Sequence, residues 1–292
     1  MQCITLSNAK SFGTCTFVPK ASLFSDGEIC IDFSSVDFSL SSSFLVVQSL
    51  FGNSNSLLEL LFAIDVICRN SSSNIHLLLL YLSYARQDRE ISRYSPISAK
   101  VIADVLSNQN IQTISVVEIH SPQVQGFFNK PCFNISLQDI FLKHIRETFL
   151  LQDTVICAAD IGGAKSARKI SEYLAVQSAI VEKTRSAPGV SQALSVIGDV
   201  FGKNCIIVDD IIDSAGTLCN AANILKQNGA KDIFAYAAHG IFSGSALEKI
   251  ENSALSKVFV SNTLPQKYSS KVEYIDVSEN VLNQVKIRVS SF

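Results

Sequence analysis

The stretch NCIIVDDIIDSAGTLCNAANILKQN, residues 204–228, joins a buried strand, a short polar loop and an amphipathic helix. Its first part, 204–211, is an apolar run of strand length that ends around the adjacent carboxylates Asp209 and Asp210. Its second part, 217–228, repeats apolar residues at helical spacing. A strand that passes through a polar loop directly into a helix is the unit from which parallel α/β sheets are built.

The same alternation runs outward from this stretch in both directions, over the whole 292-residue chain. Further strands are expected at 43–50, 75–82, 111–119, 154–160, 178–183, 232–239, 257–262 and 272–277. Further helices are expected at 57–68, 98–107, 164–174 and 245–252. The sequence therefore predicts an α/β fold with two tandem domains of parallel sheets flanked by helices. We place the domains at 1–140 and 141–292, with the boundary near 138–146.

The composition is that of a globular protein, with 47% hydrophobic and 17% charged residues. The formal net charge is −2 and no basic block stands out, so nucleic acid is not an expected partner. No targeting segment is evident and no apolar run reaches the length of a membrane helix, so we expect a cytoplasmic protein without a membrane partner. The eight cysteines show no CxxC spacing, which argues against a zinc ribbon. Cys157 and Cys205 lie in apolar runs and are expected to be buried free thiols.

The loop between the strand and the helix has the composition of an anion site. Its residues are Asp213, Ser214, Ala215, Gly216 and Thr217. Small residues at a helix start direct backbone N–H groups at an anion, and the two hydroxyls can add donors. Asp209 and Asp210, just upstream, are suited to vicinal sugar hydroxyls. The alternative is an ordinary turn in which Asp213 or Ser214 caps the helix.

Polar side chains also follow four other expected strands. They are Arg86, Gln87 and Asp88 after 75–82, His120 after 111–119, Asp160 in 154–160, and Lys183 and Arg185 at the end of 178–183. Arginine can bind phosphate through two parallel hydrogen bonds. His120 and Asp160 occupy equivalent positions in the two halves and could share a Mg²⁺ whose other ligands are water and phosphate oxygens.

Taken singly, each of these features has an ordinary alternative. The segment 84–90 could be a solvated loop, His120 a core residue, and Lys183 and Arg185 surface charges. Because ligands gather at the carboxyl ends of parallel strands, the set together favours a site for a sugar and a polyphosphate.

The order of these motifs resembles the ribose-phosphate pyrophosphokinase family. The similar segments are FSDGE (24–28), VVQS, YARQD, SPISAK, HSPQVQGFF, DIGGAK, EKTR, IGDV, VDDIID, GTL, AAHGIFSG and NTLP (262–265). The complete ordered set is far more specific than any one motif. The resemblance implies two phosphoribosyltransferase-like halves, an ATP side in 1–140 and a ribose 5-phosphate side in 141–292. It implies a kinase that transfers a pyrophosphoryl group from Mg·ATP to ribose 5-phosphate, giving phosphoribosyl pyrophosphate (PRPP) and AMP.

The resemblance also assigns roles to single residues. It implies ATP contacts from Arg86, Gln87 and Asp88, and from Phe24, Asp26 and Glu28 toward the adenine site of a neighbouring subunit. It implies that His120 and Asp160 hold Mg²⁺, that Asp209, Asp210 and the loop 213–217 hold ribose 5-phosphate, and that Lys183 and Arg185 stabilise the transferring group. The implied enzyme is a homo-oligomer, a hexamer built from dimers.

Two other functions remain open from the sequence. Residues 29–56 depart from the family pattern, since SSVDFSLSSS (34–43) stands where relatives carry an Arg-Gly step, and this favours a non-catalytic homologue that regulates an active synthetase. Retention of Lys183 and Arg185 favours the enzyme instead. The segment 209–217 also fits a phosphoribosyltransferase that consumes PRPP, but YARQD and HSPQVQGFF favour the synthetase.

Overall fold

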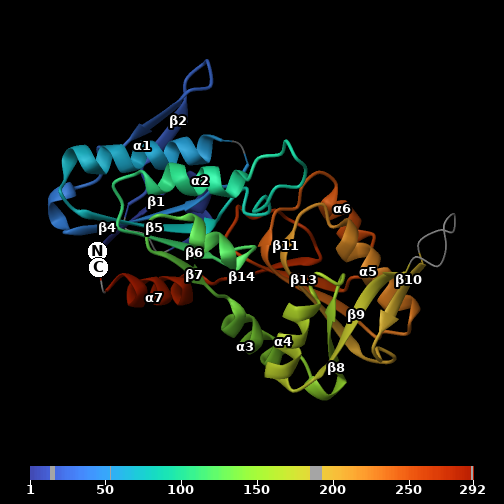
Figure 1. Cartoon of the computed structure of the whole chain (residues 1–292). Helices are drawn as coiled ribbons and strands as arrows, with labels where there is room; N and C mark the ends of the chain where they lie inside the picture. The colour runs from blue at the N-terminus through green and yellow to red at the C-terminus, as the bar shows by residue number, and fades with distance from the viewer. Residues whose placement is uncertain (14–16, 53, 185–192, 291) are drawn as a thin grey trace. The chain divides into compact units, whose positions relative to one another are not determined.

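The computed structural model describes the chain except for residues 14–16, 53, 185–192 and 291 (Figure 1). Its contacts divide the chain into two compact units. Unit 1 comprises Met1–Leu137, Asn262–Pro265 and Asp276–Phe292, and unit 2 comprises Gln138–Ser261 and Gln266–Ile275. The chain thus leaves unit 1 twice, after Leu137 and after Pro265, and returns to it each time.

Unit 1 is built on a parallel sheet with strand order β1-β4-β5-β6-β7. The strands are β1 (Gln2–Thr5), β4 (Ser43–Ser49), β5 (Asn74–Tyr81), β6 (Thr113–Val117) and β7 (Cys132–Ile135). The three central strands are those predicted at 43–50, 75–82 and 111–119. They are buried along nearly their whole length, as the continuous apolar runs of a two-sided parallel sheet require.

Helices cover both faces of this sheet, with α1 (Asn55–Asn70) and α2 (Ser98–Ser107) on one side and α7 (Ser278–Val289) on the other (Figure 1). The sequence predicts all of 141–292 in the second domain, whereas α7 belongs to unit 1. The physical reason is its apolar stripe. Val281, Val285 and Val289 recur at intervals of four, are buried, and face β6 and β7.

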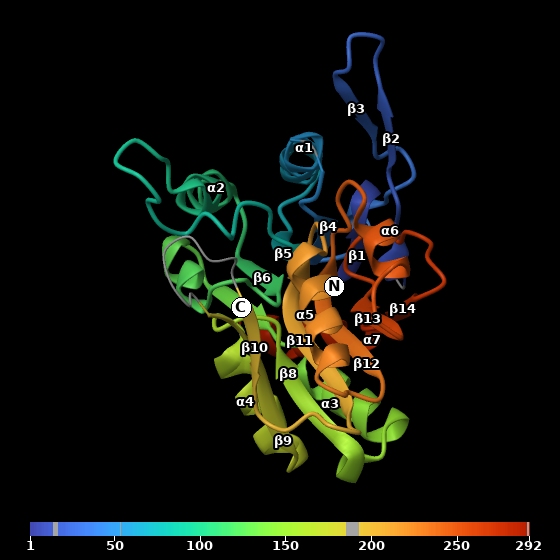
Figure 2. The ribbon, with the colours of Figure 1, turned by 90° about the vertical axis from the view of Figure 1, so that its right-hand side faces the viewer.

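A two-stranded antiparallel hairpin, β2 (Lys20–Leu23) and β3 (Ile29–Asp32), also belongs to unit 1. Figure 2 shows it projecting away from the rest of that unit. Every residue of β2 is exposed, so this hairpin lacks the inward-facing apolar row of a core strand. Short 3₁₀ helices complete the described irregular segments: Ser7–Phe12, Phe38–Leu40 and Pro122–Phe127 in unit 1, and Leu151–Asp153 in unit 2.

Unit 2 is built on a seven-stranded sheet with order β10-β9-β8-β11-β12-β13-β14. Its strands are β8 (Thr154–Ala158), β9 (Gln177–Thr184), β10 (Ala193–Ile197), β11 (Asn204–Ile212), β12 (Ile233–Gly240), β13 (Lys257–Ser261) and β14 (Val272–Ile275). Its helices are α3 (Gln138–Thr148), α4 (Ala164–Leu174), α5 (Gly216–Gln227) and α6 (Ala246–Glu251). All pairings are parallel except that of β9 with β10. The predicted α/β class, with parallel sheets flanked by helices, is confirmed.

Cys157 and Cys205 are buried free thiols, as expected, on the neighbouring strands β8 and β11. Within the described ranges, no helix combines the length and the apolar character that a membrane span requires.

Candidate functional site

The end of β11 presents two adjacent carboxylates in unit 2. The backbone N–H of Asp210 donates to Asp209 Oδ1 at 2.9 Å, which orients the first carboxylate along the strand. Partial removal from water, and next the neighbouring Asp210 carboxyl, raise the pKa of Asp209 to about 7, and Asp160 adds to the effect. The Asp209 side chain is still largely exposed to solvent, but the neighbouring carboxylates alone are enough to raise its pKa. Because these three acidic groups lie close together, a bound cation or a hydroxyl donor would reduce their mutual repulsion.

The loop 213–217 leads directly into α5. Ala215 is the residue before that helix, and its methyl side chain makes no capping hydrogen bond. Ala215 is buried and adopts a left-handed conformation with φ 59°. A helix start leaves its first backbone N–H groups without intrahelical partners, and this one carries the exposed residues Ser214 and Thr217 beside them. The arrangement suits an anion.

A second loop, at 241–244, holds the first in place; its sequence is part of the segment AAHGIFSG, to which the sequence assigns no role. Ser243, just after β12, donates from its hydroxyl to Asp213 Oδ1 at 2.5 Å and from its backbone N–H to the Asp213 carbonyl at 3.1 Å. Lys249 in α6 donates to the Ser214 carbonyl at 3.2 Å. The motif AAHGIFSG directly after an expected strand is the signal from which this contact could have been sought.

Asp160 lies in an exposed turn between β8 and α4. Its Oδ1 accepts the Gly163 N–H at 3.1 Å, which folds the turn back on itself. Neither Gly162 nor Gly163 has a positive φ. A methyl at 163 would meet only ordinary contacts, the nearest being Ala158 Cβ at 3.6 Å, whereas a methyl at 162 would lie 3.1 Å from Asp160 Oδ1. The glycine at 162 therefore lets the Asp160 carboxylate lie close against the turn.

In unit 1, Arg86, Gln87 and Asp88 lie in the loop after β5. The Gln87 N–H donates to the Tyr84 carbonyl at 2.8 Å, and Gln87 Oε1 accepts the Ser98 hydroxyl at 2.6 Å at the start of α2. These bonds tie the loop to the helix. Arg86 is exposed at the carboxyl end of the sheet, where the sequence predicts a phosphate contact.

His120 is exposed, so it does not fill the core of unit 1. Two residues earlier, Glu118 has a positive φ of 40°, a strained conformation for a side-chain-bearing residue. Its Oε1 accepts the hydroxyl of Ser136 at 2.9 Å and also the backbone N–H of Leu137. This anchoring of Glu118 turns the chain out of β6 and delivers His120 to the surface. No local sequence pattern predicts this role for Glu118.

Phe24, Asp26 and Glu28 form the turn of the projecting hairpin (Figure 2). The Phe24 N–H donates to the Glu28 carbonyl at 2.8 Å, and the Glu28 N–H donates to Asp26 Oδ1 at 3.0 Å. All three side chains are exposed, with 58% of Phe24 open to solvent, so none of them supports the core.

Comparisons with known proteins bear on both units. The family model described as "N-terminal domain of ribose phosphate pyrophosphokinase" matches residues 8–109, and that described as "Phosphoribosyl synthetase-associated domain" matches residues 160–290. The ribose-phosphate pyrophosphokinase of Aquifex aeolicus is 38% identical over 259 residues, covering 87% of this chain and 82% of that protein. The chain belongs to the ribose-phosphate pyrophosphokinase family.

Further relatives agree with this assignment. The ribose-phosphate pyrophosphokinase of Wolinella succinogenes is 40% identical over 256 residues, covering 87% of this chain and 82% of the relative. The crystal structure of phosphoribosylpyrophosphate synthetase from Mycobacterium smegmatis matches with a TM-score of 0.85 at 28% identity and covers 100% of both chains. The predicted resemblance and the phosphoribosyltransferase-like fold are thereby confirmed. The regulatory alternative finds no support among these ribose-phosphate pyrophosphokinases.

Of the two residues predicted to stabilise the transferring group, Lys183 lies near the end of β9. The backbone of Lys183 pairs with Leu194 in β10, whereas its side chain and the whole of Arg185 lie outside the described part of the structure. Among the residues that are described, no three His, Cys, Asp or Glu side chains converge as a protein cage for a metal would require. A Mg²⁺ bound with substrate phosphates in a ribose-phosphate pyrophosphokinase needs no such cage, because one or two carboxylates suffice.

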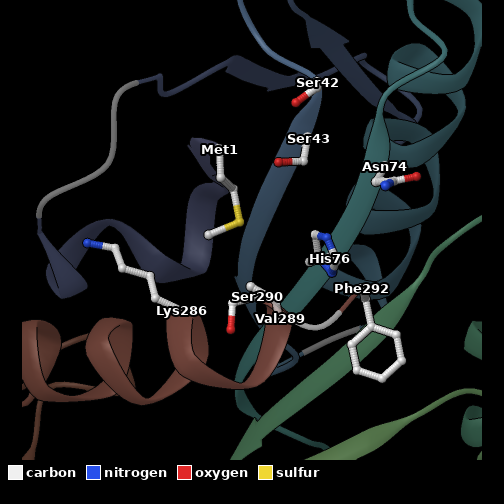
Figure 3. A pocket seen from close by; sticks show the side chains of 9 residues that line it. All are labelled: Met1, Ser42, Ser43, Asn74, His76, Lys286, Val289, Ser290 and Phe292. Carbon is white, nitrogen blue, oxygen red and sulfur yellow. The ribbon is translucent and has the colours of Figure 1, made fainter.

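A cavity of about 350 Å³ opens elsewhere in unit 1 (Figure 3). It is lined by Met1, Ser42, Ser43, Asn74, His76, Lys286, Val289, Ser290 and Phe292. These include the amino ends of β4 and β5, the opposite edge of the sheet from the loop that carries Arg86. His76 is buried with its Nδ1 2.8 Å from Thr113 Oγ1, and burial lowers its pKa. This cavity is separate from the site expected in a ribose-phosphate pyrophosphokinase.

Proposed function

We propose that this chain transfers a pyrophosphoryl group from Mg·ATP to ribose 5-phosphate, giving PRPP and AMP. The observation that carries the proposal is the last part of β11, where Asp209 and Asp210 are followed by the loop 213–217 at the start of α5. Vicinal acids can accept hydrogen bonds from sugar hydroxyls, and the loop offers N–H groups and hydroxyls to a phosphate. Membership of the ribose-phosphate pyrophosphokinase family supports the same activity.

In this proposal Asp209 and Asp210 hold the ribose hydroxyls, and Asp213, Ser214, Ala215, Gly216 and Thr217 hold the 5-phosphate. Arg86, Gln87 and Asp88 bind ATP. The hydrogen bonds of Gln87 with Tyr84 and Ser98 support a preformed loop, and a preformed loop lowers the entropic cost of binding ATP.

His120 and Asp160 are the proposed magnesium ligands. The exposed Asp160 carboxylate, with further acidic groups near it, suits a hard divalent cation that keeps most of its shell as water and phosphate oxygens, and the exposed His120 is the second proposed ligand. When bound, Mg²⁺ would supply positive charge against the phosphate oxygens of ATP.

The chemical step is a displacement at the β-phosphorus of ATP. The ribose 1-hydroxyl forms a new O–P bond, the bond from the β-phosphorus to the bridging oxygen breaks, AMP leaves with that electron pair, and the hydroxyl proton passes to solvent. Positioning and charge stabilisation supply most of the acceleration in such reactions, so no dedicated general base is assigned. Lys183 and Arg185 would place positive charge on the transferring group.

We further propose a homo-oligomer, a hexamer built from dimers, in which the exposed turn of Phe24, Asp26 and Glu28 reaches the adenine of ATP in a neighbouring subunit. A cytoplasmic location suits the substrates, since ATP and ribose 5-phosphate are cytoplasmic metabolites.

The test is to measure AMP and PRPP with purified protein, ribose 5-phosphate, ATP and Mg²⁺, with and without inorganic phosphate. Equimolar AMP and PRPP are expected. A folded protein that forms no AMP under either condition would instead favour the non-catalytic regulatory homologue.

Lys183→Ala is expected to lower kcat by roughly 100- to 1000-fold, equivalent to about 2.7–4 kcal/mol for one lost transition-state donor. Lys203→Ala is the control, because the Lys203 ammonium contacts surface groups, the Gln152 carbonyl at 3.1 Å and Asp153 at 3.7 Å. Near-normal turnover by Lys183→Ala would remove this residue from the mechanism.

A further inference from the structure

Lys267 makes a contact that its place in the sequence does not explain. Its Nζ donates to two consecutive carbonyls, those of Ile241 at 3.0 Å and Phe242 at 2.8 Å. Its own backbone is clamped by Tyr274 in β14, which accepts the Lys267 N–H at 2.7 Å and donates to the Lys267 carbonyl at 3.0 Å. Tyr274, in the edge strand of the unit 2 sheet, therefore fixes the backbone from which the Lys267 ammonium group extends.

The segment that receives these bonds is a tight and strained turn. Phe242 is buried and has a φ of 49°. Its ring lies so close to Gly240 that a methyl there would come within 2.4 Å of it. A bulky residue in this conformation is unfavourable and persists only where its surroundings hold it. Hydrogen bonds from a charged donor are the strong kind that can do so.

The same turn holds the end of β11. The N–H groups of Ile241 and Phe242 both donate to the Ile212 carbonyl, at 2.9 and 3.1 Å. Ser243 then bonds Asp213 through both its backbone and its hydroxyl. The pairing of β11 with β12 thus continues beyond the sheet into the first residue of the loop 213–217.

We infer that Lys267 is a positioning residue for ribose 5-phosphate: through the turn 241–243 it fixes Asp213 and the start of the phosphate loop, without touching the substrate. The inference rests on the proposed function and adds a residue outside all the motifs that carry the family resemblance. Removing the ammonium leaves two carbonyls of a strained turn without their charged donor. The turn relaxes, Ser243 releases Asp213, and the loop loses its preorganised shape.

The test compares Lys267→Met with Lys271→Met. Lys271 is a matched control in the same unit, since its Nζ also donates to two carbonyls, of Ser253 at 2.9 Å and Ile250 at 3.4 Å, but neither belongs to the turn or the phosphate loop. Binding of ribose 5-phosphate is measured by calorimetry without ATP, and KM and kcat are measured in the full reaction.

For Lys267→Met we expect Kd and KM for ribose 5-phosphate to rise roughly tenfold, with kcat changed less than about threefold and KM for ATP unchanged. Lys267→Arg, which keeps the charge and the donors, should restore most of the affinity. Lys271→Met should bind ribose 5-phosphate as the wild type does, even where the two methionine variants lose similar thermal stability.

Equal ribose 5-phosphate affinity in the two methionine variants would overturn the inference while leaving the proposed function intact. So would a loss in Lys267→Met that appears only in kcat. A wild-type chain that binds no ribose 5-phosphate would overturn the proposed function, and the inference with it.

Discussion

At the residue scale, the conformation of Ala215 is the most restrictive feature of the candidate phosphate loop. It combines a φ of 59° with burial in the core of unit 2. Left-handed backbone is natural for glycine and unfavourable for residues with a Cβ, by about 1–2 kcal/mol. A side chain larger than that of alanine would add volume to a buried site whose backbone is already unfavourable.

Ala215→Val is therefore expected to lower the free energy of unfolding by about 2 kcal/mol, because a β-branched side chain adds crowding to an already strained backbone. Ala215→Gly is the control. It relieves strain but gives the unfolded chain more freedom, so its stability should stay within about 1 kcal/mol of the wild type. Denaturant unfolding measures both, and a valine variant as stable as the glycine variant would contradict the strain argument.

Asp209 introduces a pH dependence of known sign. Its folded-state pKa of about 7 lies above the ordinary value, so between about pH 4 and pH 7 the folded state holds a proton that the unfolded state has released. The free energy of unfolding therefore falls through this group as pH rises over that window, and does not fall further above it.

Asp209→Asn removes this penalty, so its Tm should exceed that of the wild type at pH 8 and by much less at pH 4.5. Asp153→Asn serves as the control, since Asp153 is a surface partner of Lys203, and its effect should be small at both pH values. Scanning calorimetry at the two pH values decides the matter. A gain of equal size at both would contradict the raised pKa.

The candidate site was predictable from residue types and their place after strands, since Asp209, Asp210 and Arg86 lie at strand ends by local pattern alone. The sequence does not predict the roles of Glu118, Ser243 and Lys267. Each acts through hydrogen bonds to the backbone of a segment distant in sequence, and no periodicity or motif encodes such a partner.

At the element scale, strands with long apolar runs were predicted well, because burial on both faces leaves a clear signal in β4, β5 and β11. The four-residue strands β1, β2, β3 and β7 were missed, since four residues are few in which to show a period, although β14, of the same length, was predicted at 272–277. The helix α3 occupies the stretch 138–148, where the sequence analysis expects a boundary between domains.

The helix α7 offers an experiment at this scale. Val285→Ala removes buried methyl groups facing the unit 1 sheet and should cost about 2 kcal/mol, within the range for truncated core side chains. Ile287→Ala is a control in the same helix, because 73% of Ile287 is exposed, and should change stability by less than about 0.5 kcal/mol. Similar losses in the two variants, measured by thermal unfolding, would mean that α7 is not packed on the sheet as described.

At the scale of the whole molecule, the projecting hairpin bears on the proposed oligomer. Phe24→Ala should raise KM for ATP roughly tenfold, since stacking of a base on an aromatic ring contributes about 1–3 kcal/mol. Tm should not change, because Phe24 supports no core.

Mixed oligomers of two variants test whether Phe24 acts in the active site of a neighbouring subunit. Subunits of Phe24→Ala carry an intact Lys183, and subunits of Lys183→Ala carry an intact Phe24. Mixed oligomers should therefore recover activity at low ATP that neither variant shows alone. No recovery, with mixed assembly verified by mass, would mean that Phe24 does not act in a neighbouring subunit.

The return of the chain to unit 1 has a consequence for biosynthesis. Unit 2 is in effect inserted into unit 1, whose last helix, α7, is encoded at residues 278–289. A ribosome releases the residues of unit 2 before those of α7, so the sheet of unit 2 can fold while translation continues. The unit 1 sheet emerges first, yet the face that α7 covers stays without this helix until residues 278–289 have been synthesised. Transiently exposed apolar surface of this kind promotes aggregation, so this face of the sheet needs protection during synthesis until α7 packs on it.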